Sequence, residues 1–207
     1  MTTIIDYGTG NVFSILKKLQ ANGVQACLSD EPKIILNSDR LILPGVGHFG
    51  KAMNHLRKSD LDKVLQEAVL ERKKNILGIC LGMQLMTQGS EEGDEEGLGW
   101  FQCKTQRLSP IDTSRYKIPH IGWNTVQHNE SHPIFTGVES GSEMYFVHAY
   151  GVLHSKEEEV LSTTTYENLF VSSLQKNNIV GMQFHPEKSH VAGSKIFQNF
   201  TQCIDHV

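Results

Sequence analysis

The chain has 207 residues, of which 39% are hydrophobic and 20% are charged, a composition typical of one folded domain with a sizeable core. A net charge of −4 argues against a nucleic-acid-binding protein, and no apolar run is long enough to span a membrane. The N-terminal residues lack the basic and apolar regions of a secretory signal. We therefore predict a single cytoplasmic domain over residues 1–207. Its cysteines are too scattered for a disulfide framework or a zinc site: Cys27, Cys80, Cys103 and Cys203.

The first half of the chain alternates short apolar runs with helical segments. Strands are predicted at residues 2–6, 24–28 and 40–43, and a helix at residues 11–21. This order implies parallel strands with right-handed crossovers, so we predict an α/β fold with a mostly parallel central sheet flanked by helices. The turn after the first strand has two glycines where a dinucleotide loop needs three, and Asn11 is interpreted as a helix cap.

The segment around Cys80 has the pattern of a nucleophile elbow. An apolar run at residues 76–79 predicts a buried strand, and residues 81–88 have helical spacing. Cys80 lies between them, with Gly78 and Gly82 as small neighbours that relieve the crowding of a tight turn. A helix N-terminus favours a thiolate, so Cys80 is a candidate nucleophile. A cysteine that merely packs in the core is the alternative.

A glycine-rich loop at residues 44–50 follows the third predicted strand. The carboxyl ends of parallel strands are where α/β folds bind ligands. We expect this loop and the residue after Cys80 to supply N–H groups for an oxyanion hole, although a flexible turn is the alternative. The candidate donors are Gly45, Val46, Gly47 and Leu81. An amphipathic helix is predicted at residues 61–73, leading to the strand before Cys80.

The second half is rich in strand patterns. Residues 89–99 form a glycine-punctuated acidic loop, most of whose charges we expect to be solvated. A last helix is predicted at residues 189–204. Between them lie segments with strand-forming composition: 100–107, 117–126, 143–148, 160–164, 169–174 and 179–183. We therefore predict that a mixed, partly antiparallel extension continues the sheet.

A histidine and a carboxylate lie two residues apart after the last predicted strand. In an extended backbone His185 and Glu187 would point the same way, and Pro186 keeps His185 out of helical geometry. A histidine beside a carboxylate is a base with a fixed tautomer. The motif alone is also compatible with an exposed turn. Together with Cys80, it completes a nucleophile, a base and an orienting carboxylate.

Two motifs carry a resemblance to a known family. Residues 78–84, Gly-Ile-Cys-Leu-Gly-Met-Gln, and residues 185–187, His-Pro-Glu, resemble the triad glutamine amidotransferases. The similarity extends along essentially the whole chain. Further segments are similar to one branch of that family, the glutaminase subunits of imidazole glycerol phosphate synthase: residues 6–11, 44–47, 122–124, 145–148 and 185–189.

The resemblance implies a catalytic role for three residues. Cys80 would attack the side-chain amide of glutamine, His185 would pass the proton to the departing ammonia, and Glu187 would orient His185. A glutamyl thioester would form and be hydrolysed by water, and no cofactor or metal is expected. The residues implied to hold glutamine are Gln84, Glu92 and the main chain near His148, Ala149 and Tyr150. Ala149 replaces an expected Ser or Thr, which puts glutamine affinity in doubt if that contact uses a hydroxyl.

The resemblance also implies a partner. The family delivers ammonia through a tunnel to a cyclase subunit with a (β/α)₈ barrel, which closes the imidazole ring of imidazole glycerol phosphate. The residues implied to face it are Asn11, Trp123, Tyr145 and Lys188. An exposed Trp and Tyr suit an interface, and core packing is the alternative for both. His120 is expected to be structural.

Three other hypotheses stay open at this point. The same chemistry could serve sugar amidation through a paralogous barrel partner, because the acceptor binds on the other subunit. Cys80 could also act on a different amide. A non-catalytic binding module on the same fold is the third hypothesis, and the complete set of Cys80, His185 and Glu187 argues against it.

Overall fold

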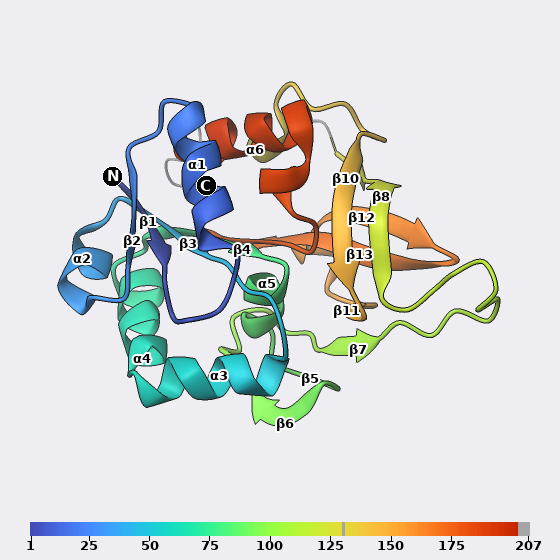
Figure 1. The fold of residues 1–207 in the computed structure, drawn as a ribbon, viewed down its shortest axis with the longest axis horizontal. Helices are drawn as coiled ribbons and strands as arrows, with labels where there is room; N and C mark the ends of the chain where they lie inside the picture. The colour runs from blue at the N-terminus through green and yellow to red at the C-terminus, as the bar shows by residue number, and fades with distance from the viewer. Residues whose placement is uncertain (130, 203–207) are drawn as a thin grey trace.

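The computed structural model describes residues 1–129 and 131–202, and within them a 12-stranded mixed sheet forms the centre of the molecule (Figure 1). Its parallel part has the strand order β2-β1-β3-β4-β14. These strands are mostly apolar because helices or strands cover both faces. Their bounds are β2 (Ala26–Ser29), β1 (Thr2–Ile5), β3 (Arg40–Leu43), β4 (Asn75–Ile79) and β14 (Ile179–Met182).

From β14 the sheet continues in the order β13-β11-β7-β5-β6. These pairs are antiparallel except β5 with β7, which is parallel, and β12 and β9 branch from β13. A separate antiparallel pair, β8 with β10, packs beside it (Figure 1). The predicted fold class, a mostly parallel sheet with a mixed extension, is therefore confirmed. The bounds are β5 (Gly89–Ser90), β6 (Gly93–Glu96), β7 (Thr105–Arg107), β8 (His120–Thr125), β9 (Gln127–His128), β10 (Glu143–His148), β11 (Tyr150–Val152), β12 (Val160–Tyr166) and β13 (Asn168–Lys176).

Alternation along the central strands divides the core between the two faces of the sheet. Ile4 and Ile42 point to the face covered by α1, α6 and the β8–β10 pair, whereas Ile5 and Leu41 point to the face covered by α3, α4 and α5 (Figure 1). The helices are α1 (Val12–Ala21), α2 (Pro32–Asn37), α3 (Phe49–Lys58), α4 (Leu61–Gln66), α5 (Leu81–Leu85) and α6 (His190–Gln202). Short 3₁₀ turns lie at Pro133–Phe135, Glu157–Glu159 and Pro186–Lys188.

Several predicted boundaries differ from the structure. The helix expected at residues 61–73 is α4 followed by a π-helical turn, Glu67–Glu71, and the helix after Cys80 ends at Leu85 rather than residue 88. The acidic loop contains β5 and β6, and α3 was not expected. The predicted end of the last helix at residue 204, and Cys203, lie outside the described residues.

Candidate active site

Cys80 lies at the strand-to-helix turn between β4 and α5. Its φ of 54° and ψ of −112° place it in a region that non-glycine residues rarely adopt. Its N–H donates to Met182 O at 2.7 Å, which anchors the turn to β14. A Cβ at Gly82 would lie 1.8 Å from Leu43 O, and one at Gly78 would lie 2.7 Å from the Met86 side chain. The turn therefore requires both glycines, as the elbow pattern predicts.

His185 and Glu187 approach Cys80 from the end of β14. His185 Nδ1 and Glu187 Oε1 are 2.7 Å apart, and both side chains are at most 2% exposed. The expectation of an extended backbone through this motif is wrong for Glu187, because Pro186–Lys188 forms a 3₁₀ turn. The expected pair of side chains therefore forms, but a 3₁₀ turn rather than an extended backbone brings the Glu187 carboxylate to the His185 ring.

Two bonds fix the position of the His185 backbone. His185 N–H donates to Tyr145 O at 2.9 Å, and Ser189 Oγ donates to His185 O at 2.6 Å. Among the described residues, His185 Nε2 is buried without a hydrogen-bond partner. The nitrogen opposite the carboxylate is therefore available for proton exchange with a reacting group.

The protonation of His185 is set by its neighbours. Burial opposes the charged imidazolium, but the negative charge of Cys80 and the Glu187 carboxylate outweigh it and raise the pKa of His185 to about 10. The site therefore favours the protonated, positively charged form of the His185 imidazole. A thiolate, the reactive form of cysteine, would be stabilised by this neighbouring charge.

A cavity of about 320 Å³ opens over Cys80. Nearly all the residues predicted for the oxyanion hole and the glutamine pocket line it: Val46, Gly47, Leu81, Gln84, Glu92, His148, Ala149 and Tyr150. Lys188, predicted for the interface, lines it as well. The structure does not place Gly45, Asn11, Trp123 or Tyr145 in its lining. Their roles, like those of the lining residues, stay predictions.

The loop after β3 is anchored by Tyr7, a residue that sequence reasoning missed. Tyr7 Oη donates to Pro44 O at 2.8 Å, and burial raises the pKa of this phenol, so it stays protonated. A Cβ at Gly45 would lie 2.7 Å from Tyr7 Oη, so the loop has no room for a side chain at this position. Val46, by contrast, is 44% exposed. The only signal for Tyr7 was its place in the motif at residues 6–11.

Two of the predicted glutamine-binding residues already have partners. Gln84 Nε2 donates to Tyr150 O at 2.8 Å, and Glu92 Oε2 accepts from Phe49 N at 2.8 Å, at the start of α3. Glu92 thus complements the positive end of α3 as well as facing the cavity. Ala149 O accepts from Leu108 N at 2.9 Å, which holds this main chain beside the cavity.

Two buried histidines, His148 and His120, are hydrogen-bonded to each other, and His148 lines the cavity over Cys80. His148 Nδ1 lies 2.9 Å from Tyr150 O, which only accepts, so Nδ1 carries the proton. His148 Nε2 then accepts from His120 Nδ1 at 3.1 Å. Burial lowers the pKa of His148 to about 3 and that of His120 to about 4, so both rings are neutral. The expected structural role of His120 fits this position.

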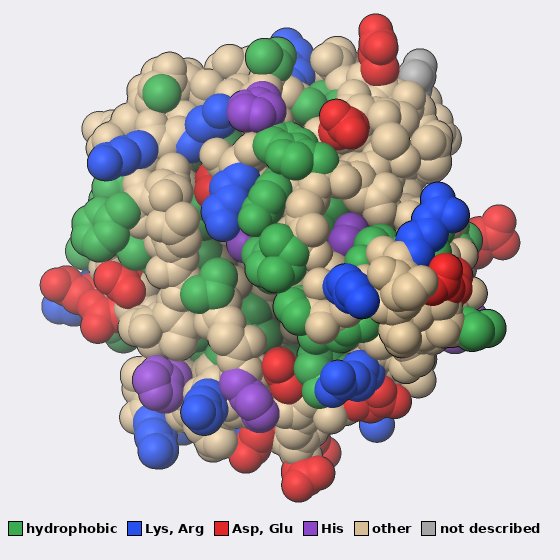
Figure 2. All heavy atoms as spheres, turned by 45° about the vertical axis from the view of Figure 1, so that its right-hand side comes forward, with side chains coloured by type: hydrophobic (Ala, Val, Ile, Leu, Met, Phe, Trp, Pro, Cys, Tyr) green, Lys and Arg blue, Asp and Glu red, His purple; other side chains and the backbone are tan. Residues whose placement is uncertain are grey.

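Of the residues predicted for the partner interface, Lys188 lines this cavity, and Tyr145 and Trp123 follow it in a row of ring contacts. Trp123 is 42% exposed; its ring stacks on His190 with centroids 4.6 Å apart and meets Tyr145 edge-on at 5.8 Å. Lys188 Nζ lies 5.0 Å from the centroid of the Tyr145 ring. Asn11 is exposed and occupies the N-cap position of α1, but its side chain makes no capping bond to the helix backbone; its Oδ1 accepts from the hydroxyl of Ser14 instead. Figure 2 shows hydrophobic side chains on this face with basic and histidine side chains beside them.

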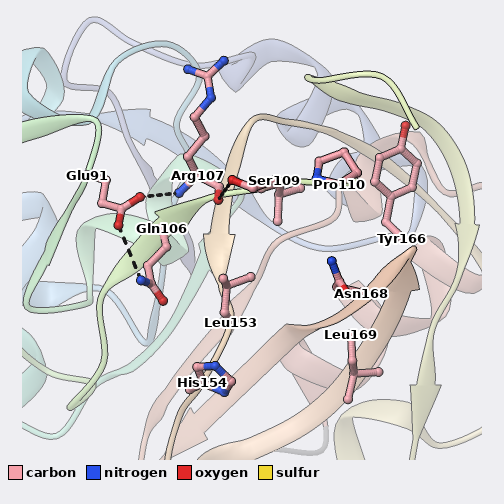
Figure 3. Close-up of a pocket in the computed structure, with 11 residues that line it drawn as sticks. Glu91, Gln106, Arg107, Ser109, Pro110, Leu153, His154, Tyr166, Asn168 and Leu169 are labelled. Atoms are coloured by element: carbon pink, nitrogen blue, oxygen red, sulfur yellow. Dashed lines mark hydrogen bonds between the residues drawn. The ribbon is translucent and has the colours of Figure 1, made fainter. Parts of the chain in front are cut away.

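A larger cavity of about 460 Å³ lies beside β7 and β11 (Figure 3). Its Glu91 carboxylate already accepts from Arg107 N and from the Gln106 side chain, and it contains none of the three candidate catalytic residues. Within residues 1–129 and 131–202, no group of three or more His, Cys, Asp or Glu side chains is placed to hold a metal ion. None of the described helices is both long and apolar enough to cross a membrane.

Comparisons with known proteins agree on the family. Residues 3–203 match the family model described as glutamine amidotransferase class-I. The chain is 41% identical to imidazole glycerol phosphate synthase subunit HisH 2 of Pseudomonas aeruginosa over 99% of this chain and 100% of that protein. It is 43% identical to the subunit of the same name from Methanococcus maripaludis, over 97% and 98%.

A solved structure supports the fold. The structure of PurLQS from Thermotoga maritima has a TM-score of 0.74 and 19% identity, over 97% of this chain and 96% of that one. The chain therefore belongs to the class-I glutamine amidotransferases and, within them, to the family of HisH subunits of imidazole glycerol phosphate synthase.

Proposed function

We propose that this chain hydrolyses the side-chain amide of glutamine and supplies the ammonia to a barrel-shaped cyclase subunit that forms imidazole glycerol phosphate in histidine biosynthesis. The relatives' names support the pathway. The observation that carries the proposal is the convergence of Cys80, from the elbow, with the His185–Glu187 pair, from the end of β14.

The chemistry follows from the positions of these groups. The thiol proton moves from Cys80 Sγ to His185 Nε2, and the sulfur attacks the amide carbon of glutamine. His185 returns the proton to the leaving nitrogen, so ammonia departs and a glutamyl thioester remains. Water, deprotonated by His185, then cleaves the thioester to glutamate. Glu187 holds the ring orientation and stabilises its charge throughout.

The oxyanion formed at each stage needs N–H donors. The Leu81 N–H lies in the first turn of α5, where amides have no intrahelical partner, and Leu81 lines the same cavity as Cys80. Val46 and Gly47 line the same cavity from the loop that Tyr7 anchors. A lost oxyanion donor costs about 2.7–4 kcal/mol of barrier, so the position of this loop controls turnover.

Gln84 and Glu92 are the side chains that we assign to the bound glutamine. Both line the cavity together with residues 148–150, and Gln84 Nε2 is bonded to Tyr150 O. Ala149 presents no hydroxyl, and its carbonyl is already bound, so we propose that residues 148–150 hold the substrate through backbone groups. The cysteines that the structure describes, Cys27, Cys80 and Cys103, are unpaired, which fits a reducing compartment, and we place the reaction in the cytoplasm.

The principal test is Cys80→Ala, assayed for glutamate release in the presence of the cyclase subunit and its ligand. We expect a loss of about 10³-fold or more. Wild-type protein should also be labelled at Cys80 by a glutamine-like electrophile. A Cys80→Ala protein with full activity would contradict the mechanism. If only a sugar-amidating partner stimulated hydrolysis, the chemistry would stand and the assigned acceptor would be wrong.

The partner surface has a test of its own. Trp123→Ala removes an exposed aromatic ring that contacts Tyr145 and His190, and we expect Kd for the cyclase subunit to rise about 30-fold, or about 2 kcal/mol. Leu70→Ala is the control, because Leu70 is also exposed but belongs to the π-helical turn on the opposite face of the sheet. Equal effects of the two substitutions would argue against this surface.

A further inference from the structure

Gln183 is a buried side chain beside the sulfur that the mechanism so far does not use. It directly follows β14 and is fully buried. Its backbone N–H donates to Ser172 O at 2.9 Å, which holds it against β13. Its side-chain Nε2 lies 3.7 Å from Cys80 Sγ, within hydrogen-bond distance for sulfur.

The orientation of the Gln183 amide is determined by its neighbour Gln84. Gln84 Nε2 donates to Tyr150 O at 2.8 Å and to Gln183 Oε1 at 3.0 Å. Both acceptors are carbonyl oxygens, so the Gln84 NH₂ group must face them. Turning the Gln183 amide over would set two NH₂ groups against each other and direct a carbonyl oxygen at the sulfur. The network therefore points the Gln183 N–H at Cys80.

We propose that Gln183 is a positioning residue for Cys80, donating a side-chain hydrogen bond to the sulfur and connecting it to Gln84. The inference rests on the proposed function, since it gives that nucleophile its donor. In the thiol form, Cys80 Sγ donates to Val147 O at 3.8 Å. When the proton moves to His185 Nε2, that bond is lost and the bond from Gln183 becomes charge-assisted and stronger. Gln183 thereby favours the thiolate.

The test measures how fast iodoacetamide alkylates Cys80 in the full chain as a function of pH, with each cysteine followed by mass spectrometry. Gln183→Met keeps the length of the side chain and removes the donor. We expect the midpoint of the Cys80 profile to move up by about one pH unit. Groups that bear on the sulfur or line its cavity remain the same in the variant: Tyr7, Glu92, His148, His185, Glu187 and Lys188.

Asn199→Leu is the matched control. Asn199 is also a buried amide, whose Nδ2 donates to Ile134 O and Thr136 O far from the cavity. Its loss should lower stability and leave the Cys80 midpoint unchanged. Gln183→Glu retains the shape if the methionine variant fails to fold, and a carboxylate beside the sulfur should raise the midpoint at least as far.

A wild-type midpoint in a folded variant of either kind overturns the proposal. Because iodoacetamide does not need the glutamine pocket, this result can be read even if the chain proves not to hydrolyse glutamine. Conversely, a shifted midpoint in a chain without glutaminase activity would leave the role of Gln183 intact and the proposed function wrong. In a chain that does hydrolyse glutamine, Gln183→Met should lower kcat/KM about tenfold.

Discussion

Two buried pairs that contain histidine, His185 with Glu187 and His148 with His120, differ in charge. His185 is paired with the Glu187 carboxylate and lies next to the Cys80 sulfur, and its pKa is raised to about 10. His148 is paired with a neutral imidazole, His120, and a backbone carbonyl, and its pKa is lowered to about 3. Burial acts against charge in both pairs, so the partner decides which ring is protonated.

The same side chain can therefore serve as a proposed base at His185 and as a structural support at His148, because the partners of the two rings differ. The neutral pair needs fixed tautomers, and each of its donors meets an acceptor. Asn124 Nδ2 adds a further donor, since it lies 3.4 Å from His120 Nε2, the ring nitrogen without a proton. The charged pair leaves one ring nitrogen, His185 Nε2, without a hydrogen-bond partner among the described residues, and the proposed mechanism uses this nitrogen to accept the thiol proton.

Replacing the Glu187 carboxylate should have the largest effect on the difference in charge between His185 and His148. Glu187→Gln retains the shape but removes the charge that orients and stabilises the His185 imidazolium. We expect kcat/KM for glutamine hydrolysis to fall about 10³–10⁴-fold. Glu91→Gln, at an exposed carboxylate in the other cavity, should change it little. A fall of less than tenfold for Glu187→Gln would show that His185 does not depend on this partner.

The neutral pair should make the protein sensitive to acid. His120 and His148 have pKa values of about 4 and about 3 when folded, below their ordinary value of 6.5. Protons bind the unfolded chain first, so the stability they contribute is complete above pH 6.5 and is lost as pH falls toward 3. Each ring contributes a slope of up to about 1.4 kcal/mol per pH unit.

Urea unfolding at several pH values between 7 and 5 measures this slope. His120→Gln removes one of the two titrating rings, and its free energy of unfolding should fall less steeply with acid than that of the wild type. His154→Gln changes a histidine in the large cavity instead and should retain the wild-type slope. Parallel curves for all three proteins would mean that His120 is not held neutral by burial.

The charged pair should respond in the opposite direction at high pH. A raised pKa means that the stability contributed by His185 is complete below pH 6.5 and is lost as pH rises through about 10. Because the charge of Cys80 is the largest influence that raises this pKa, Cys80→Ala should move the NMR titration of the His185 ring to lower pH. The His148 ring should remain neutral in both proteins, and an unmoved His185 titration would contradict the influence of Cys80 on the pKa of His185.

Much of the sheet and the three catalytic candidates could be predicted from the sequence, because apolar runs and short motifs are local signals. The predicted strands, of which the first is at residues 2–6 and the last at 179–183, have sequences in which apolar and polar residues alternate or apolar residues form a continuous run. The missed elements lacked such signals. α3 starts at a histidine cap within a glycine-rich loop, and β5 and β6 are short segments in an acidic stretch.

The contacts in the site that sequence reasoning missed are tertiary contacts. The His120–His148 bond requires β8 and β10 to pair in the register that sets these two residues opposite each other. The Tyr7–Pro44 bond joins residues 37 positions apart, and the Gln183–Cys80 contact joins residues 103 apart. No pattern within one segment could indicate these contacts. The single-domain expectation for residues 1–207 stays a prediction.

The close approach of Gly82 to Leu43 O has a consequence for engineering. Main chain meets main chain there with no side chain between, so the spacing between the elbow and the loop at residues 44–47 cannot be tuned by repacking. A graft of this catalytic apparatus into another scaffold would have to transfer the end of β3, the loop and α5 as one rigid cassette. Exchanging any of the three separately would leave the cleft misaligned.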